Sequence, residues 1–206
     1  MQLVDFETAR KFLLEYKISF PRTVFIISEK DLLKSVKDFK YPVFLKIYGK
    51  NILHRTEKMG VGEAANKAEM ARMFSKMIKI EGVEGILIQE KAFGKSLIIG
   101  MKRDAQFGPV IIVGIGGIFA EVLKDFVLRV APVSEKDALK MLAELKGYDY
   151  LLGKRDRNPV NLKEIAKIVV ALSKLSLKKT EIKEIDLNPV IVDGQEALAV
   201  DFKFLT

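Results

Sequence analysis

The sequence predicts a mixed α+β protein, and two observations support this fold class. Amphipathic segments with apolar residues every three or four positions alternate with short runs rich in β-branched and aromatic residues. In addition, 49% of the residues are hydrophobic, which is enough apolar material for a packed core. The length of 206 residues allows one domain or two small lobes. We therefore expect a single module over 1–206, with one lobe over approximately 1–92 and a second over approximately 93–206.

The first half of the chain alternates helices and strands. Apolar residues at helical spacing predict a helix over 5–17, which is followed by an extended stretch over 18–27. Ser28 and Asp31 have the spacing of a capping box and open a second short helix. The remaining elements expected here are a strand over 43–48, a polar loop over 49–62, a helix over 66–79, and strands over 85–90 and 97–102.

The second half combines capped helices with strands that end at glycine turns. Ser134 and Asn161 are each followed three residues later by an acidic residue, which predicts helices running to about residues 146 and 177. The dipeptide Asp193-Gly194 is a strong hairpin signal. Strands are expected on both sides of the glycine cluster 114–117 and around this hairpin, over 110–113, 118–123, 182–187, 190–192 and 197–202.

The charge and the rare residue types exclude several classes of function. The net charge of +8 favours polyanionic partners such as nucleotides, nucleic acid or coenzyme A. The sequence has no cysteine, which excludes disulfides, thiolate catalysis and cysteine-bound metals, and its single histidine, His54, excludes a multi-histidine metal site. The longest nearly apolar run, 109–120, is too short to span a membrane, and acidic residues stand where a secretory signal would be basic. We expect a cytoplasmic protein with no membrane partner.

A lysine lies in the middle of the predicted strand 43–48. Strand alternation places Lys46 on the same face as Phe44 and Tyr48. Burial of an ammonium group is costly unless an anion such as a phosphate compensates it. The residues alone leave two interpretations open, namely a phosphate ligand in a cleft and an exposed lysine on a solvated sheet face.

Oxygen-bearing side chains gather near the end of the chain. Glu184, Asp186 and Asn188 lie in one short segment, and Asp201 lies across the predicted hairpin. Mg²⁺ prefers such hard oxygen ligands and completes its shell with water and substrate phosphates. The same residue types are common in turns for backbone reasons, so the pattern is also compatible with a site that binds nothing.

Three other motifs carry little information by themselves. Gly94-Lys95-Ser96 is not a phosphate-binding P-loop, because Gln89 stands where the first glycine is required. The glycine cluster 114–117 lacks the third glycine of the dinucleotide fingerprint and is equally compatible with a tight turn. His54 is either a surface loop residue or a phosphate carrier helped by the adjacent Arg55.

Four blocks of the sequence resemble the β subunit of the ADP-forming acyl-CoA (acetate–CoA) synthetases, relatives of succinyl-CoA synthetase. They are YPVFLKI with ILHRTE at 41–57, GMKRDAQFGPV at 100–110, GIGGIFAEVLKD at 114–125, and EIDLNPV at 184–190 together with Asp201. The resemblance implies an ATP-grasp fold, in which two α+β lobes clasp a nucleotide between antiparallel sheets. It also implies reversible conversion of acyl-CoA, ADP and phosphate into acid, CoA and ATP, through an acyl phosphate and a phosphohistidine.

The resemblance further implies a partner and a set of site residues. A separate α subunit or a fused region would carry the CoA and acid sites, so we expect a hetero-oligomer that binds no nucleic acid. Phosphates would be contacted by Lys46, and the phosphate relay would pass through His54, with Gly60 and Val61 ending the loop after it. Adenine or ribose would be held by Gln89, Glu90, Lys91, Ala92 and Phe93. Mg²⁺ would be bound by Asn188 and Asp201, with Glu184 as a further ligand.

The sequence also departs from the family pattern. Ser96 or Leu97 stands where the family has a glutamate, and Met59-Gly60 replaces a double glycine. The stretch 62–65 replaces a family strand, and 152–157 differs from the Gly-Tyr-Arg-Gly form. One alternative is therefore a catalytically degenerate ATP-grasp module with a regulatory or scaffolding role. Another is a basic RNA-binding domain, suggested only by the net charge. Neither the acid substrate nor the choice between ADP and GDP follows from the sequence.

Overall fold

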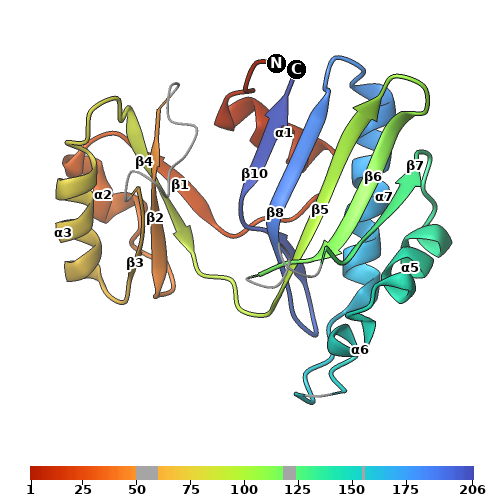
Figure 1. Cartoon of the computed structure of the whole chain (residues 1–206). Helices are drawn as coiled ribbons and strands as arrows, with labels where there is room; N and C mark the ends of the chain where they lie inside the picture. The colour runs from red at the N-terminus through yellow and green to blue at the C-terminus, as the bar shows by residue number, and fades with distance from the viewer. Residues whose placement is uncertain (50–59, 118–123, 155) are drawn as a thin grey trace. The chain divides into compact units, whose positions relative to one another are not determined.

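The computed structural model describes residues 1–49, 60–117, 124–154 and 156–206 and divides the chain into two compact units. Unit 1 combines residues 1–20 with 92–206, and unit 2 consists of residues 21–91 (Figure 1). The predicted first lobe wrongly included residues 1–20. Long-range pairing explains the difference, because the backbone N–H of Gln2 donates to the carbonyl of Thr206 at 2.9 Å and the N–H of Val4 donates to that of Phe204 at 2.9 Å.

Unit 2 is a four-stranded antiparallel sheet with two helices on one face. The strand order is β1-β4-β2-β3. The elements are β1 (Thr23–Ile26), α2 (Glu29–Ser35), β2 (Val43–Tyr48), β3 (Val61–Ala64), α3 (Lys67–Met77) and β4 (Gly85–Glu90). Alternate residues of the strands pack against the helices in a core that includes the fully buried Leu45, Ile88 and Phe74. The opposite face of the sheet carries no helix among the residues of unit 2 that the structure describes.

Two local features of unit 2 differ from the sequence expectations. The stretch 62–65, predicted to replace a family strand, lies largely within strand β3, which pairs with β2 from Lys46↔Val61 to Val43↔Ala64. Backbone pairing explains this, because β2 supplies hydrogen-bond partners whatever small residues β3 carries. At the start of α2 the hydroxyl of Ser28 donates to the carboxylate of Asp31 at 2.7 Å, and it does not cap the helix backbone.

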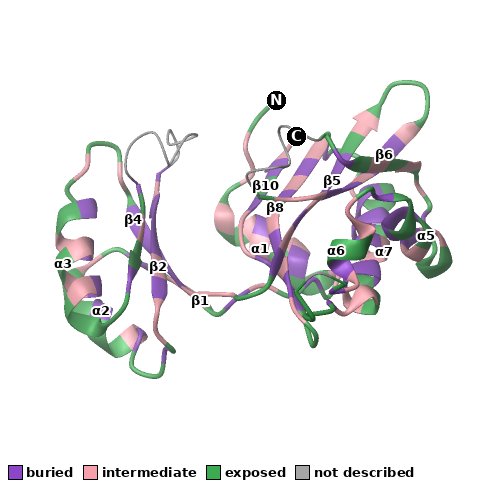
Figure 2. Ribbon diagram, turned by 60° about the horizontal axis from the view of Figure 1, so that its bottom comes forward, coloured by how far each residue is buried: buried purple, intermediate pink, exposed green. Residues whose placement is uncertain are grey.

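Unit 1 is a six-stranded antiparallel sheet whose core lies between one face and the helices. The path β10-β8-β5-β6-β7 forms the sheet, and β9 pairs with β8. The strands are β5 (Lys95–Asp104), β6 (Gly108–Ile115), β7 (Phe126–Val130), β8 (Glu184–Val192), β9 (Ala197–Ala199) and β10 (Phe202–Leu205). The helices are α1 (Phe6–Glu15), α5 (Glu135–Glu144), α6 (Tyr148–Leu151) and α7 (Leu162–Lys178). Figure 2 shows buried residues along the strands and on the inner sides of the helices.

The predicted helix starts of unit 1 are confirmed. Ser134 and Asp137 form a reciprocal capping box at α5. Asn161 caps α7 by accepting hydrogen bonds from the backbone N–H groups of Lys163 and Glu164. Helix α5 ends at Glu144, two residues before the predicted end. No helix among the described residues has both the length and the apolar composition needed to cross a membrane.

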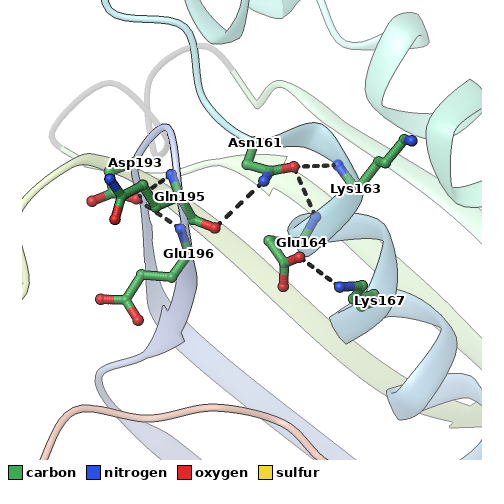
Figure 3. A network of polar contacts seen from close by, with 7 residues as sticks. All are labelled: Asn161, Lys163, Glu164, Lys167, Asp193, Gln195 and Glu196. Carbon is green, nitrogen blue, oxygen red and sulfur yellow. Dashed lines mark hydrogen bonds and ion pairs between the residues drawn. The ribbon is translucent and has the colours of Figure 1, made fainter.

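The predicted hairpin at Asp193-Gly194 joins β8 to β9 and is tied to α7 (Figure 3). The carboxylate of Asp193 accepts from the backbone N–H groups of Gln195 at 2.7 Å and Glu196 at 2.8 Å. The side-chain amide of Asn161 donates to the carbonyl of Gln195 at 3.4 Å. The same asparagine therefore caps α7 and anchors the hairpin.

Two predictions for the strands of unit 1 were inaccurate. The predicted strands 182–187 and 190–192 are replaced by one strand, β8, which begins at Glu184 and continues through Asn188, because β10 pairs with its first half and β9 with its second half. Strand β7 was not predicted, and the predicted strand 118–123 lies outside the described residues.

Candidate functional site

The face of the unit 2 sheet that carries no helix holds the candidate phosphate ligand. Val43, Leu45 and Ile47 of β2 are fully buried on the helix side, so the alternating residues Phe44 and Lys46 lie on the other face. Lys46 is 7% exposed, which decides against the interpretation of an exposed lysine. A buried ammonium is a favourable position for a phosphate, because the anion offsets the cost of removing the charge from water.

Gln89 of β4 lies on the same face as Lys46, directly opposite Phe44. It is 3% exposed, and its side-chain N–H₂ donates to Thr23 Oγ1 at 3.0 Å. The hydroxyl of Thr23 in turn donates to the carbonyl of Pro21 at 2.7 Å. The buried Oε1 of Gln89 has no hydrogen-bond partner among the described residues, which is unusual for a buried polar atom.

The side chains of Glu90 and Lys91 are engaged within unit 2. Glu90 pairs with Val43, on the helix side of the sheet, and its carboxylate accepts from the backbone N–H of Lys40 at 2.9 Å. The ammonium of Lys91 binds both carboxylate oxygens of Glu63, at 2.9 and 3.0 Å. Of these three neighbouring residues, Gln89 is therefore the one whose side chain lies on the face of Lys46 with an unsatisfied acceptor.

The other predicted nucleotide residues are scattered. Gly60 is buried, and its carbonyl accepts from the N–H of Ile47 at 2.8 Å, whereas Val61 is exposed at the start of β3. Ala92 and Phe93 belong to unit 1, and Phe93 is 64% exposed. His54 lies outside the described residues.

The candidate metal ligands lie on the face of the unit 1 sheet opposite the described helices. Ile185 and Leu187 of β8 are buried on the helix side, so Glu184, Asp186 and Asn188 alternate onto the other face. The backbone N–H of Asn188 donates to the carbonyl of Asp201 at 3.1 Å. The structure thus brings Asn188 and Asp201 together on adjacent segments.

Asp186 belongs to the same group, although the sequence analysis gave it no role. It stands opposite Lys203 of β10 and Gly100 of β5. Burial raises the pKa of Asp186, Lys203 opposes this rise, and the carboxylates of Asp201 and Glu184 add to it. The sequence analysis had grouped Asp186 with Glu184 and Asn188, and the period of two along β8 was the signal that places all three on one face.

These oxygen atoms fit Mg²⁺ but do not enclose it. Among the described residues, no three acidic or histidine side chains lie close enough together to hold a metal ion by themselves. Mg²⁺ needs only one or two protein oxygens, because water and phosphates complete its shell. Asn188 and Asp201 supply one amide and one carboxylate of the required hard-donor type, so the fit is to a metal that arrives with phosphate.

The block at 100–110 has a structural explanation. The guanidinium of Arg103 donates to the carbonyls of Ser176 at 2.7 Å and Ile182 at 3.0 Å, which caps the C-terminal end of α7. The carboxylate of Asp104 accepts from the N–H groups of Gln106 and Phe107, which closes the turn between β5 and β6. These residues stabilise the scaffold on which β8 lies.

Residues at two positions that depart from the family pattern contact other parts of unit 1. The carbonyl of Ser96 accepts from the N–H of Gly116 at 2.8 Å, and a side chain at Gly116 would meet Ser96 Oγ at 2.4 Å. Asp156, in the divergent stretch 152–157, accepts from the buried ammonium of Lys95 at 3.0 Å. Both positions therefore have local structural partners.

Comparison with known proteins agrees with this arrangement. The model of the ATP-grasp domain family matches residues 2–205. The β subunit of ADP-forming acetate–CoA ligase I from Pyrococcus furiosus is 37% identical over 208 residues, covering 96% of this chain and 89% of that subunit. The ADP-forming acetate–CoA ligase I of Archaeoglobus fulgidus is 38% identical over 85% of this chain, which spans only 26% of that longer protein.

A solved structure is similar over nearly the whole chain. It is the dinucleotide-forming acetyl-coenzyme A synthetase 1 of Ca. Korarchaeum cryptofilum with coenzyme A and Mg-AMPPCP, in which a phosphohistidine segment points towards the nucleotide-binding site. Its TM-score is 0.87 at 30% identity, and the match covers 99% of this chain and 92% of that one.

Proposed function

We propose that this chain, which belongs to the ATP-grasp family of the ADP-forming acetate–CoA ligase β subunits, is the nucleotide-binding subunit of an ADP-forming acyl-CoA synthetase. The observation that carries the proposal is the buried Lys46 on a sheet face without helices, within a chain that matches these β subunits along almost all of its length. The RNA-binding interpretation rested on net charge alone and is not retained.

The proposed reaction transfers one phosphoryl group in three balanced steps. Phosphate displaces CoA from acyl-CoA to give an acyl phosphate in the partner. His54 takes the phosphoryl group and releases the acid, and ADP then takes it from the phosphohistidine to give ATP. Only the last two steps involve residues of this chain. Such transfers depend chiefly on positioning and on cations that balance charge on the phosphoryl oxygens.

The described residues have distinct tasks in this proposal. Lys46 binds and orients the nucleotide phosphates, and its burial keeps water away from the contact. Asn188 and Asp201 hold Mg²⁺, with Glu184 and Asp186 beside them on the same face. When bound, Mg²⁺ neutralises phosphate charge. Gln89 contacts the base. Cytoplasmic location stays a prediction.

A partner follows from the relatives. The Pyrococcus relative is named as a subunit, whereas the Archaeoglobus relative is a single chain of which this sequence matches about a quarter. We infer that a partner polypeptide supplies the CoA and acid sites. Mixing this chain with such a partner is expected to give ATP formation from acyl-CoA, ADP and phosphate that neither polypeptide supports alone. A complex that binds nucleotide without turnover would instead favour the degenerate, regulatory module.

Calorimetric titration of the full chain with ADP tests the binding part directly. We expect binding that Mg²⁺ strengthens, and a loss of about 100-fold in affinity in Lys46→Ala, as for a charge-assisted phosphate contact. The matched control is Lys34→Ala, which removes an exposed lysine from the same unit. Equal affinities in the two variants would overturn the assignment of Lys46.

A further inference from the structure

The two edge strands of the unit 1 sheet differ in how their outer sides are covered. Residues 2–4 run along β10, and the N–H of Val4 donates to the carbonyl of Phe204 at 2.9 Å. Strand β7 forms the other edge, and no described strand pairs with its outer side (Figure 1). Edge strands present unpaired backbone groups, which natural proteins usually cover or protect with charged residues. Within the described part of the chain, β7 is therefore the uncovered edge of this sheet.

The backbone groups that face outward from β7 belong to its even-numbered residues, Phe126, Leu128 and Val130, which we call the outward residues. The N–H of Ala131 donates to the carbonyl of Pro109 in β6 at 2.8 Å, so the odd-numbered residues turn their N–H and C=O groups towards β6. The even-numbered residues turn theirs away from β6. The carbonyl of Leu128 also accepts from the guanidinium of its neighbour Arg129 at 2.9 Å, and it keeps a second lone pair.

The side chains of the outward residues form an apolar row on the face opposite the helices. Phe126, Leu128 and Val130 are 54%, 46% and 47% exposed. Their row continues onto β6, where Ile112 stands opposite Leu128 and Val110 stands opposite Val130. Unpaired backbone groups and exposed apolar side chains thus occur at the same positions of β7. This combination suits the addition of another extended strand.

We propose that β7 pairs with β7 of a second copy of this chain, antiparallel about a two-fold axis at Leu128. In this register Leu128 faces its own copy and Phe126 faces Val130, so every outward backbone group gains a partner and apolar side chains meet apolar side chains. The two six-stranded sheets then form one continuous sheet. The inference is independent of the proposed nucleotide-binding function.

The charges beside β7 are compatible with a second copy. Arg129 and Glu144 form an ion pair on the helix side of the strand, so each copy brings one cation and one anion to the axis. A two-fold interface places the same patch against itself, and a patch with balanced charge avoids repulsion. Lys124 precedes the apolar row, and the same register places it opposite Pro132 of the second copy. The net charge of +8 is screened beyond about 8 Å at physiological ionic strength.

Sedimentation equilibrium of the full chain measures this association. We expect a dimer with a dissociation constant in about the micromolar range, as for a small interface. Leu128→Lys places two ammonium groups against each other at the axis, so the dissociation constant is expected to rise by about 100-fold or more. The matched control is Leu33→Lys, which changes a leucine of similar exposure, 48%, in unit 2 and is expected to dimerise like the wild type.

Amide hydrogen exchange of the wild type keeps the test decisive if Leu128→Lys does not fold. The amide hydrogens of the outward residues are expected to exchange more slowly in concentrated than in dilute protein. Those of Val127 and Arg129 already point to β6 and serve as the internal control. A chain that stays monomeric up to about 1 mM overturns the inference and leaves this edge to the partner polypeptide. A dimer that Leu128→Lys does not weaken, or one with unchanged exchange at the outward residues, overturns it as well.

Discussion

Two buried lysines, one in each unit, show how the same residue type is used in different ways. Lys95 opens β5 on the helix side of its sheet, and the protein itself supplies its partners, the carbonyl of Tyr150, the carboxylate of Asp156 and the ring of Tyr150 at 4.2 Å. Lys46 lies in the middle of β2 on the face that carries no helix of its unit, beside an aromatic ring and an unsatisfied amide oxygen. Burial alone therefore does not distinguish the two lysines, whereas the sheet face on which each side chain lies does.

Replacement of Lys46 tests the difference between the two lysines most directly. Lys46→Met keeps the length of the side chain and removes the charge, so nucleotide affinity is expected to fall by about 100-fold. The midpoint of thermal unfolding without ligand is compared with that of the wild type, which shows whether the folded state also depends on this charge. Calorimetry and thermal melts measure the two effects. A variant that loses stability and keeps its affinity would show that Lys46 is structural, like Lys95.

The next prediction concerns Asn188, which lies on the face of the unit 1 sheet opposite the described helices. Asn188→Ala is expected to remove most of the strengthening of ADP binding by Mg²⁺, about tenfold, and to leave binding without Mg²⁺ unchanged. The reason is that Asn188 is exposed and its side chain supports no core contact. Titrations at several Mg²⁺ concentrations measure this effect, with Asn158→Ala as a control because it removes an exposed asparagine elsewhere in the same unit. Unchanged Mg²⁺ dependence in Asn188→Ala would remove this residue from the metal site.

The pair Lys95 and Asp156 offers a smaller effect on stability. Lys95→Met is expected to change the free energy of unfolding by about 1 kcal/mol or less, because the carboxylate left behind is partly solvated. Asp156→Ala is expected to be the more damaging change, since it leaves the ammonium of Lys95 buried with one ionic partner fewer. Urea unfolding of both variants gives the order. The reverse order would mean that the pair does not hold the 152–157 segment to β5.

The smallest effect concerns the pH dependence of that pair. The hydrogen bond from Lys95 holds the pKa of Asp156 below its ordinary value of 3.8. A depressed carboxyl pKa contributes stability above the unfolded value, and this contribution is lost as the pH falls through the folded value. Stability curves between pH 5 and pH 2 are therefore expected to fall less steeply in Lys95→Met than in the wild type. Parallel curves would show that another partner of Asp156 lowers its pKa.

Local patterns in the sequence predict much of the fold. Ser134 and Asn161 mark the helix starts because capping needs only a polar side chain and nearby N–H groups. Strand β7 was missed because its large residues, Phe126, Leu128 and Val130, are exposed, whereas the apolar run before it attracted the prediction. The place of residues 1–20 in unit 1 depends on pairing with the far end of the chain, which no local pattern contains.

The sequence indicated which residues belong to the candidate site, but it did not predict how they are arranged in space. Lys46 stood out because a lysine in an apolar strand is unusual, whereas Asn188 received its role from the family resemblance, since oxygen donors are common near turns. Whether Lys46 is buried depends on the neighbouring strands β3 and β4, which only the fold provides. Gln89 and Glu90 lie on opposite faces of the sheet because consecutive residues of a strand alternate. Strand register determines which of the two shares the face of Lys46.

Unit 2 interrupts unit 1 as one continuous segment, 21–91, whose ends adjoin each other. The N–H of Glu90 donates to the carbonyl of Arg22 at 3.0 Å, so the chain enters and leaves unit 2 through the neighbouring strands β1 and β4. A gene fragment encoding these residues can therefore be cut out without severing any strand of the four-stranded sheet. We therefore expect that the two units, one carrying Lys46 and the other Asn188 and Asp201, can be exchanged separately between relatives.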